Sequence, residues 1–302
     1  MPVRAAIFVW YKRRSQRVKR SFTRFIGVDL GGGRGKTTAL AELRAHASGV
    51  GVEVLEVATR ASHRTPWTDE TLVQRLATPD AQTVIAVDAA LTRSACNRCE
   101  LPVCPGMEAC DVPAVVWLRT EGRALVQRVA SETAGAGSHR PILTASALTS
   151  QARLAPYTHR ATDVIMTYER GLLPLSSLGG SNSLIAARAN QLRRRLATAD
   201  YHLHQNLLEV SAVATITALC GPRAARGYRR DADPWRTRAL ILERFTDLAF
   251  APSSRMARED ALQNDHCFDA LVAAYTAYLW ARDGWPTPDG CFVEDGWITA
   301  PP

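Results

Sequence analysis

The chain has 302 residues, of which 46% are hydrophobic and 22% charged, and this composition is typical of a globular protein with one or two domains. No apolar run reaches the roughly 20 residues that a membrane-spanning helix needs, so the sequence predicts no membrane partner. The formal net charge of +8 arises in residues 1–24, which hold eight lysines and arginines and no acid. The remainder is neutral, and its charge therefore does not predict tight non-specific binding to DNA.

Residues 1–24 form a basic leader that has several interpretations. An acid-free, arginine-rich start is typical of a nucleic-acid or membrane-surface arm, of a targeting peptide, or of an extension outside the fold. The pattern of a secretory signal is absent, because the apolar stretch at residues 5–11 is short and precedes most of the charge. We therefore expect a cytoplasmic protein with reduced cysteines, and a leader outside a folded domain at residues 25–302.

The first half of the folded domain opens with strands. A short apolar strand at residues 25–29 ends at Asp29 and leads into a glycine-rich loop at residues 31–35. Residues 36–43 fit either a second strand or the first turns of a helix. There follow a strand at 50–57, a helix at 68–76 and a strand at 83–87 that ends at Asp88. If residues 36–43 form a strand, this is the order of a ribonuclease H-like domain; a helix there gives the alternation of a doubly wound nucleotide-binding fold.

The second half of the domain is mainly helical. Residues 92–160, which contain four cysteines and several prolines, are irregular, and we interpret them as an insertion rather than a separate core. The later elements are a helix at 183–196, a buried strand at 206–211 that contains Glu209, and helices at 234–248 and 264–282. The tail, with Trp285 and Trp297, is expected to pack back onto the domain. The predicted fold is α/β, a ribonuclease H-like mixed sheet flanked by helices, with a cysteine-containing insertion.

Several acidic residues lie in or directly after these buried elements. Asp265 and Asp269 are four residues apart, so both project from one face of the last helix, which is otherwise apolar almost all round. Asp265 could cap the helix, and an arginine partner is the main alternative for Asp269. Without partners the acids would repel one another, and divalent cations would relieve that repulsion. The candidate catalytic and metal-binding acids are Asp29, Asp88, Glu209, Asp265 and Asp269.

These acids indicate a particular chemistry. Oxygen ligands suit Mg²⁺ or Mn²⁺. Two such cations about 3.5–4 Å apart can activate a water molecule and stabilise the leaving oxygen in phosphodiester cleavage. The sequence therefore predicts a metal-dependent nuclease or phosphodiesterase that hydrolyses nucleic acid, with a non-catalytic nucleic-acid binder as an alternative. His266, beside Asp265, could act as a proton shuttle or position a water molecule, or be an ordinary helix residue.

The motifs together resemble a known family. The likeness rests on the first strand with its glycine loop and Lys36, the strand IAVDAALT, and the segments YTHRATDVIMTYERGLLP, LLEVS and DHCFDALVAAYTAYLWARDGW. Over about residues 25–299 they are similar to the domain of unknown function 429 family, whose members are regarded as predicted nucleases with a ribonuclease H-like fold. The resemblance places the charged stretch at residues 160–170 near the site. It implies metal-binding acids at Asp29, Asp88, Asp265 and Asp269, with a further acid at Glu209.

The glycine loop allows a second interpretation. GGGRGKTT resembles a phosphate-binding P-loop, with Gly33, Gly35 and Lys36 as candidate nucleotide-binding residues. The glycine that the motif requires six residues before Lys36 is replaced by Leu30, and a P-loop needs residues 36–44 to be helical. A nucleotide-binding ATPase of P-loop-like or actin-like type is therefore the alternative to a nuclease.

The cysteines of the insertion predict a separate metal site. Their spacing, C-x2-C-x4-C-x5-C, is compatible with tetrahedral zinc, with an iron–sulfur cluster, or with thiols that bind no metal. Structural Zn²⁺ is the preferred interpretation, although zinc sites usually have two C-x2-C hooks. The four candidate ligands are Cys96, Cys99, Cys104 and Cys110.

Overall fold

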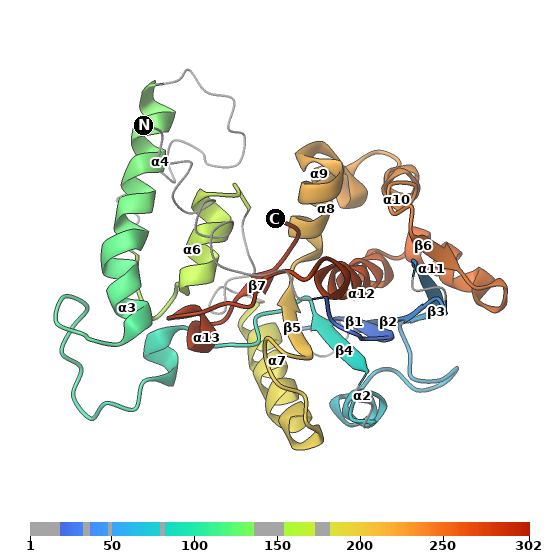
Figure 1. Cartoon of the computed structure of the whole chain (residues 1–302), viewed down its shortest axis with the longest axis horizontal. Helices are drawn as coiled ribbons and strands as arrows, with labels where there is room; N and C mark the ends of the chain where they lie inside the picture. Colours follow the sequence, from blue (N-terminus) through green and yellow to red (C-terminus); the bar gives the residue numbers. More distant parts are fainter. Residues whose placement is uncertain (1–18, 33–36, 48–49, 79–81, 136–153, 173–181) are drawn as a thin grey trace.

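The chain folds as an α/β protein. A computed structural model describes residues 19–32, 37–47, 50–78, 82–135, 154–172 and 182–302, which form a mixed seven-stranded sheet flanked by helices (Figure 1). This confirms the predicted α/β class. None of the helices in these ranges is long and apolar enough to cross a membrane. The strands are β1 (Arg24–Asp29), β2 (Ala39–Ala45), β3 (Val52–Ala58), β4 (Thr83–Val87), β5 (Leu207–Val210), β6 (Leu248–Phe250) and β7 (Ile298–Thr299).

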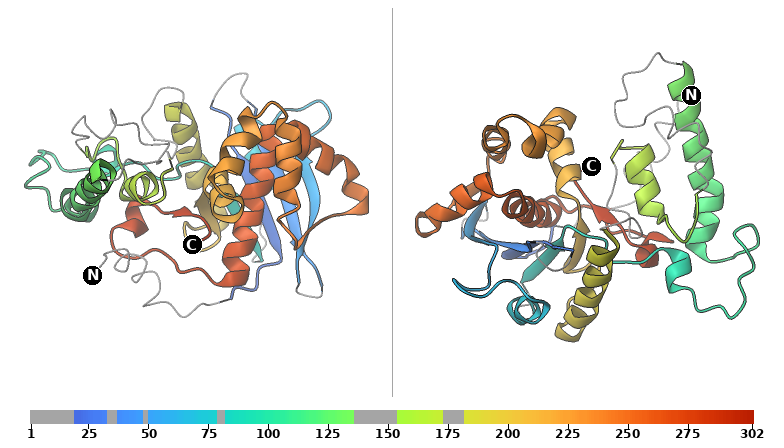
Figure 2. Two further views of the ribbon diagram at one scale, coloured as in Figure 1. Left: turned by 90° about the horizontal axis from the view of Figure 1, so that it is seen from above. Right: turned by 180° about the vertical axis from the view of Figure 1, so that it is seen from behind.

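Helices cover both faces of the sheet and extend beyond one of its edges (Figures 1 and 2). They are α2 (Asp69–Leu76), α3 (Pro113–Trp117), α4 (Arg123–Gly135), α6 (Ala161–Tyr168), α7 (Asn182–Leu196), α8 (Ala212–Cys220), α9 (Pro222–Arg230), α10 (Pro234–Leu242), α11 (Arg255–Gln263), α12 (Asp265–Asp283) and α13 (Phe292–Asp295). Shorter helical turns lie at Ala95–Arg98, Leu118–Gly122, Ala197–Ala199 and Pro252–Ser254.

The sheet has the strand order β6-β3-β2-β1-β4-β5-β7. Strand β2 runs antiparallel to both β1 and β3, whereas β4 is parallel to β1 and β5 is parallel to β4. The short strands β6 and β7 extend the two edges in parallel orientation. Ala39–Ala45 therefore forms a strand and not a helix, and the glycine loop joins two antiparallel neighbours.

Side chains of the central strands alternate between two hydrophobic layers. Phe25 of β1 belongs to the layer built with α12, and Ile26 belongs to the layer built with α2 and α7. In β4 the same alternation places Val84 on the α12 side of the sheet and Ile85 on the opposite side. Figure 1 shows this division, with α8–α12 over one face and α2 and α7 over the other. Every second residue of β1 and β4 therefore points toward α12.

Helix α12 packs directly across β1. Its start is capped by Asn264, whose side-chain oxygen accepts a hydrogen bond of 2.9 Å from the backbone N–H of His266. Gly27 permits a close approach, because a Cβ at this position would lie 1.9 Å from the carbonyl oxygen of Ala270. Nearly all of the helix beyond its first turn is buried against the sheet. This packing brings Asp269 close to the end of β1, more than two hundred residues earlier in the chain.

The predicted insertion lies beyond the sheet edge formed by β7 (Figure 1). Its helices α3 and α4 share a hydrophobic cluster with α6 and with Phe292 of the C-terminal segment. The insertion thus contributes to a small core of its own, whereas the sequence predicted an irregular segment without one. Arg160, at the start of α6, joins this part to the sheet through hydrogen bonds to Glu209 of β5.

The boundary predicted at residue 24 lies too late in the chain. Arg20 donates hydrogen bonds to the carbonyl oxygens of Trp280 (3.3 Å) and Trp285 (3.0 Å), near the end of α12, and its guanidinium lies over the Trp280 ring. Phe22 stacks on the same ring. Arginine interacts favourably with the last carbonyl groups of a helix, so the end of the basic leader belongs to the fold. Residues 1–18 lie outside the described ranges.

Candidate functional site

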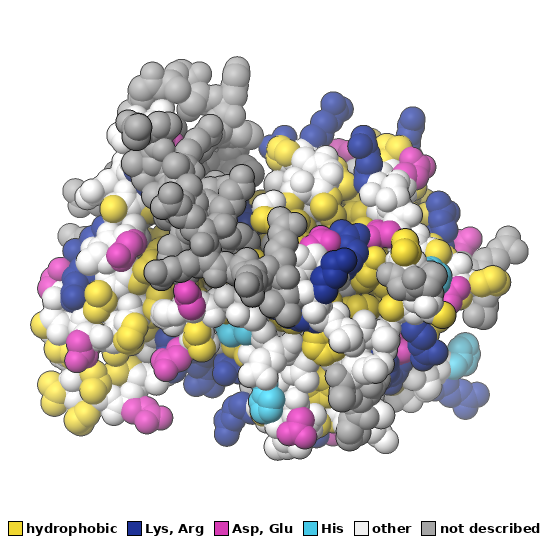
Figure 3. Space-filling model, in the orientation of Figure 1, with side chains coloured by type: hydrophobic (Ala, Val, Ile, Leu, Met, Phe, Trp, Pro, Cys, Tyr) yellow, Lys and Arg dark blue, Asp and Glu magenta, His cyan; other side chains and the backbone are white. Residues whose placement is uncertain are grey.

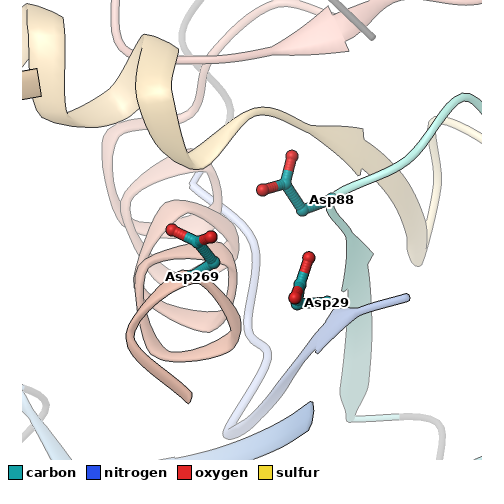
Figure 4. Close-up of side chains that lie close together, drawn as sticks. All are labelled: Asp29, Asp88 and Asp269. Atoms are coloured by element: carbon teal, nitrogen blue, oxygen red, sulfur yellow. The ribbon is translucent and has the colours of Figure 1, made fainter. Parts of the chain in front are cut away.

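Two of the predicted acids lie side by side at one edge of the sheet. Asp29 is the last residue of β1, and Asp88 directly follows β4, the parallel neighbour of β1. The carboxyl ends of parallel strands meet at the same edge, and the alternation along both strands turns these two side chains toward α12. Asp269, in the second turn of α12, completes a group of three carboxylates (Figure 4).

The three carboxylates face one another (Figure 4). One oxygen atom of each lies within 4.8 Å of the others. Asp269 is fully buried, and its Oδ1 atom has no hydrogen-bond partner among the described residues. The hydroxyl of the nearby Tyr228 is also buried and has no hydrogen-bond partner among the described residues. A buried carboxylate oxygen without a partner is costly, and a bound ligand would offset that cost.

The three carboxylates carry like charges that repel one another. Burial, followed by the charges of Asp269 and Asp29, raises the pKa of Asp88 well above its ordinary value, and the charge of Arg229 and then the backbone N–H of Ala212 offset part of this effect. Burial also raises the pKa of Asp269 to about 7, although Arg229 acts in the opposite direction. A cation that binds here would therefore release protons and relieve the repulsion.

Two basic side chains neutralise part of this negative charge. Arg229 of α9 forms an ion pair with Asp269, so the arginine partner considered as an alternative for this residue is present. Nδ1 of His266 lies 2.6 Å from Oδ2 of Asp29, and this hydrogen bond raises the pKa of the imidazole. Among the described residues, Asp88 has no ion-pair partner of this kind.

The donor set fits a hard divalent cation. It consists of carboxylate oxygens that three rigid elements hold within a short distance of one another, and one of the buried oxygens is unsatisfied. Mg²⁺ and Mn²⁺ prefer oxygen ligands of this kind. The arrangement can hold such a cation if Arg229 moves away from Asp269, or if the cation uses the free Oδ1 atom.

The other two predicted acids lie outside this group. Glu209 is in phase with Leu207, on the sheet face opposite α12, and Arg160 donates to its two oxygen atoms at 2.7 and 2.8 Å. Its inclusion among the metal ligands is therefore corrected, because the alternation along β5 turns it away from the three aspartates and an arginine neutralises it. Asp265, one turn before Asp269, is 41% exposed and lies 3.7 Å from Arg229.

The glycine loop is described only at its ends. Arg188 of α7 donates hydrogen bonds to the carbonyl oxygen of Gly31 (2.8 Å) and to the hydroxyl of Thr38 (2.6 Å), and so fixes the base of the loop. The predicted nucleotide-binding residues lie outside the described residues: Gly33, Gly35 and Lys36.

The cysteines of the insertion are all free and do not form a compact ligand group. Cys96, Cys99 and Cys104 are exposed, and Cys110 is buried. Burial and then the three neighbouring thiols raise the pKa of Cys96, so the four side chains share one region. Within the described ranges, however, the three aspartates are the one set of three or more potential ligands whose atoms lie within 4.8 Å of one another. The zinc site therefore stays a prediction.

Sequence reasoning missed two contributors to the site. Arg229 is one of four arginines within the nine residues of α9, and nothing in the spacing of these arginines identifies the one that reaches Asp269. The N-terminus of α8 directs the backbone N–H of Ala212 toward Asp88, and only the position of Ser211 as a helix cap after a buried strand could have indicated it.

Comparison of the chain with protein-family models, with curated proteins and with solved structures found no match. The resemblance to the domain of unknown function 429 family therefore stays a prediction from sequence motifs. The geometry and chemistry of the aspartate group are therefore the observations that point to a function.

Proposed function

We propose that the chain is a metal-dependent nuclease or phosphodiesterase of ribonuclease H-like architecture, in which Asp29, Asp88 and Asp269 bind Mg²⁺ or Mn²⁺. The observation that carries this proposal is the convergence of three carboxylates from β1, β4 and α12. The bound cations would supply the activation of a water molecule and the stabilisation of the leaving oxygen. The phosphodiester bond of a nucleic acid is the substrate that this chemistry fits.

The order of elements supports the ribonuclease H-like part of the proposal. Strands β1, β2 and β3 are followed by a helix and then by β4, as the sequence predicted for such a domain. The acids at the ends of β1 and β4 and on α12 occupy the positions to which the family resemblance assigns metal ligands. The glycine loop lies between two antiparallel strands, whereas a P-loop has to be followed by a helix. The P-loop alternative therefore lacks the helix that it requires.

The protein's own basic groups are suited to substrate handling. Arg229, once released from Asp269, can donate two parallel hydrogen bonds to a phosphate. His266 is held at Asp29, and its raised pKa gives it a larger protonated fraction near neutral pH than free imidazole has. Such a group can hold or transfer a proton beside the reacting phosphate.

A cleavage assay tests the proposal. Labelled single-stranded DNA, duplex DNA and RNA are incubated with the protein in Mg²⁺, in Mn²⁺ or in chelator. We expect cation-dependent cleavage of at least one substrate. Asp29→Asn, Asp88→Asn and Asp269→Asn should each lower the rate by more than about 100-fold, because loss of even an outer-shell partner of a bound metal costs about 10–100-fold.

A matched control separates this loss from a general effect of charge. Asp111 is exposed and lies in the insertion, so Asp111→Asn should cleave as the wild type does. Equal cleavage by the wild type and Asp29→Asn would identify a contaminating nuclease and contradict the proposal. Nucleic-acid binding without cleavage in any cation would support the non-catalytic binder instead.

A further inference from the structure

Helix α9, which supplies Arg229, carries an exposed row of arginines. Residues 223, 226 and 230 are spaced three and four apart and therefore lie on one face of the helix. The opposite face packs against the core of the α12 layer through the buried Tyr228 and the partly buried Ala224 and Ala225. Figure 3 shows basic side chains projecting over this part of the molecule. The arginines of this face, hereafter the α9 arginine face, are Arg223, Arg226, Arg229 and Arg230.

Contacts within the protein do not account for this charge. In the described part of the chain, no carboxylate lies within ion-pairing distance of Arg223, Arg226 or Arg230. The two nearest acids in sequence have other partners: Asp231 accepts a hydrogen bond from the Thr237 hydroxyl, and Asp233 caps α10. The outward charge of α9 is therefore available to a ligand.

Helix stability does not explain the arginines either. Like charges three or four residues apart destabilise a helix. A basic residue in the first turn, as Arg223 is, also opposes the helix dipole, which favours acids there. Arg229 and Arg230 in the last turn are favourable for the dipole, but Arg223 and Arg226 gain nothing from it. The row is thus better suited to binding an anion than to stabilising its own helix.

The α9 arginine face begins at the aspartate group. Arg229 pairs with Asp269, Arg230 follows it directly, and Arg226 and Arg223 lie about one and two turns nearer the N-terminus of the helix. The distance along the axis from residue 223 to residue 230 is about 10 Å at 1.5 Å per residue. This equals the rise of about three nucleotides in one strand of a duplex. A mononucleotide with a single phosphate cannot contact all four arginines at once.

We propose that the α9 arginine face binds successive phosphates of a nucleic-acid strand next to the aspartate group, so that the substrate is a polynucleotide and not a mononucleotide. This inference rests on the proposed nuclease function. Arg229 would hold the phosphate closest to the aspartates, and the three outer arginines would hold its neighbours. Contacts of this kind position the strand without reading its sequence.

The test measures binding separately from cleavage. The full-length chain carrying Asp88→Asn, which should not cleave, is titrated into labelled single-stranded DNA and into RNA of the same length, and fluorescence anisotropy is recorded at several salt concentrations. In this background, Arg223→Gln, Arg226→Gln and Arg230→Gln are combined in one variant. Glutamine keeps the helix propensity of arginine and removes its charge.

The triple variant should bind at least tenfold more weakly, and the slope of log affinity against log salt should fall by about 2, since each lost phosphate contact on a single strand contributes about 0.7. The matched control combines Arg44→Gln, Arg64→Gln and Arg194→Gln. These three arginines are exposed and have no ion pair among the described residues, and Arg44 lies at the end of β2 farthest from Asp29. The control should change the affinity by less than twofold.

The outcomes separate the two proposals. Equal binding by the triple variant and the control would overturn the inference about α9 while leaving any observed cleavage intact. Binding that depends on α9, together with a complete lack of cleavage by the wild type, would support this surface and contradict the nuclease. Equally tight competition by a mononucleotide and by a polynucleotide of the same phosphate concentration would contradict the substrate class.

Discussion

Asp29 and Asp88 could be singled out from the sequence because Asp29 is the last residue of a buried strand and Asp88 directly follows one, and an acid at such a position is costly and therefore informative. Glu209 could have been excluded from the candidate metal ligands by applying the alternation of side chains along its strand. It lies one position out of phase with Leu208 and Val210, which face α12, and so it points to the other side of the sheet. Its partner Arg160, by contrast, could not be inferred, since no local pattern joins residues 49 positions apart.

The contact between His266 and Asp29 predicts a pH-dependent contribution to stability. The pKa of His266 is raised above its ordinary value of 6.5 by the hydrogen bond to Asp29. The folded state therefore holds this proton more tightly than the unfolded state does. Its stabilising effect is fully present below pH 6.5 and is lost as the pH rises through the folded-state pKa.

Thermal denaturation in chelator at pH 6 and pH 9 tests whether the stabilisation by His266 is lost as the pH rises. His266→Gln should lower the Tm at pH 6 and have a smaller effect at pH 9. His63→Gln is the matched control, because His63 is exposed, and it should leave the Tm unchanged at both values. A His266→Gln variant with the same loss of Tm at both pH values would show that His266 is not protonated against Asp29.

Elements with a strong sequence pattern were predicted with nearly correct bounds. The type and bounds of the others depend on pairing with distant strands. Strand β4 and helix α12 carry their own signals, a run of β-branched residues in one and an Asn cap in the other. The helix predicted at 234–248 ends at Leu242, and Leu248 belongs to β6, where it pairs with Val52 of β3. The prediction ran too far because the apolar run continues past the helix without a stop signal. Residues 36–43 were ambiguous in the sequence, and pairing with β1 makes Ala39–Ala45 a strand.

The fit between β1 and α12 depends on Gly27. Because a Cβ there would lie 1.9 Å from the Ala270 carbonyl oxygen and 2.4 Å from the Ala274 nitrogen, Gly27→Ala must push α12 away from β1. We expect the free energy of unfolding to fall by roughly 1–3 kcal/mol, as in other overpacked cores. Cation affinity should fall as well, since α12 carries Asp269.

Chemical denaturation and cation titration of the Gly27→Ala protein measure both effects. Gly290→Ala is the control, because a Cβ at residue 290 meets no atom within 4 Å. Residue 290 has a φ of 56°, so this control should cost only the left-handed backbone strain of about 1–2 kcal/mol and leave cation affinity unchanged. Unchanged cation affinity in Gly27→Ala would show that the spacing of β1 and α12 does not set the site.

Over the whole molecule, Arg160 links the insertion to the sheet. It is fully buried and donates to Asp163 at the start of α6, to Glu209 of β5 and to Thr92 (2.8 Å). Arg160→Met leaves both carboxylates buried without their partner. Breaking a buried pair in this way typically costs about 3–5 kcal/mol.

Urea denaturation of single and double variants tests this link. Adding Glu209→Gln to Arg160→Met removes one of the uncompensated charges and should restore part of the lost stability. Hydrogen exchange in α6 should be faster in Arg160→Met than in the wild type, because the contact that holds the insertion is gone. If Arg160→Met is no less stable than the double variant, the ion pair does not hold the two parts together.

The most direct test of the account is a calorimetric titration of the wild-type protein with Mn²⁺, beside Asp29→Asn, Asp269→Asn and the control Asp111→Asn. If the three aspartates form a cation site, the wild type and Asp111→Asn bind about one or two ions per chain and release protons on binding, and the first two variants bind none. If the wild type binds no Mn²⁺, or if Asp29→Asn and Asp269→Asn bind it as the wild type does, the three carboxylates are not a metal site.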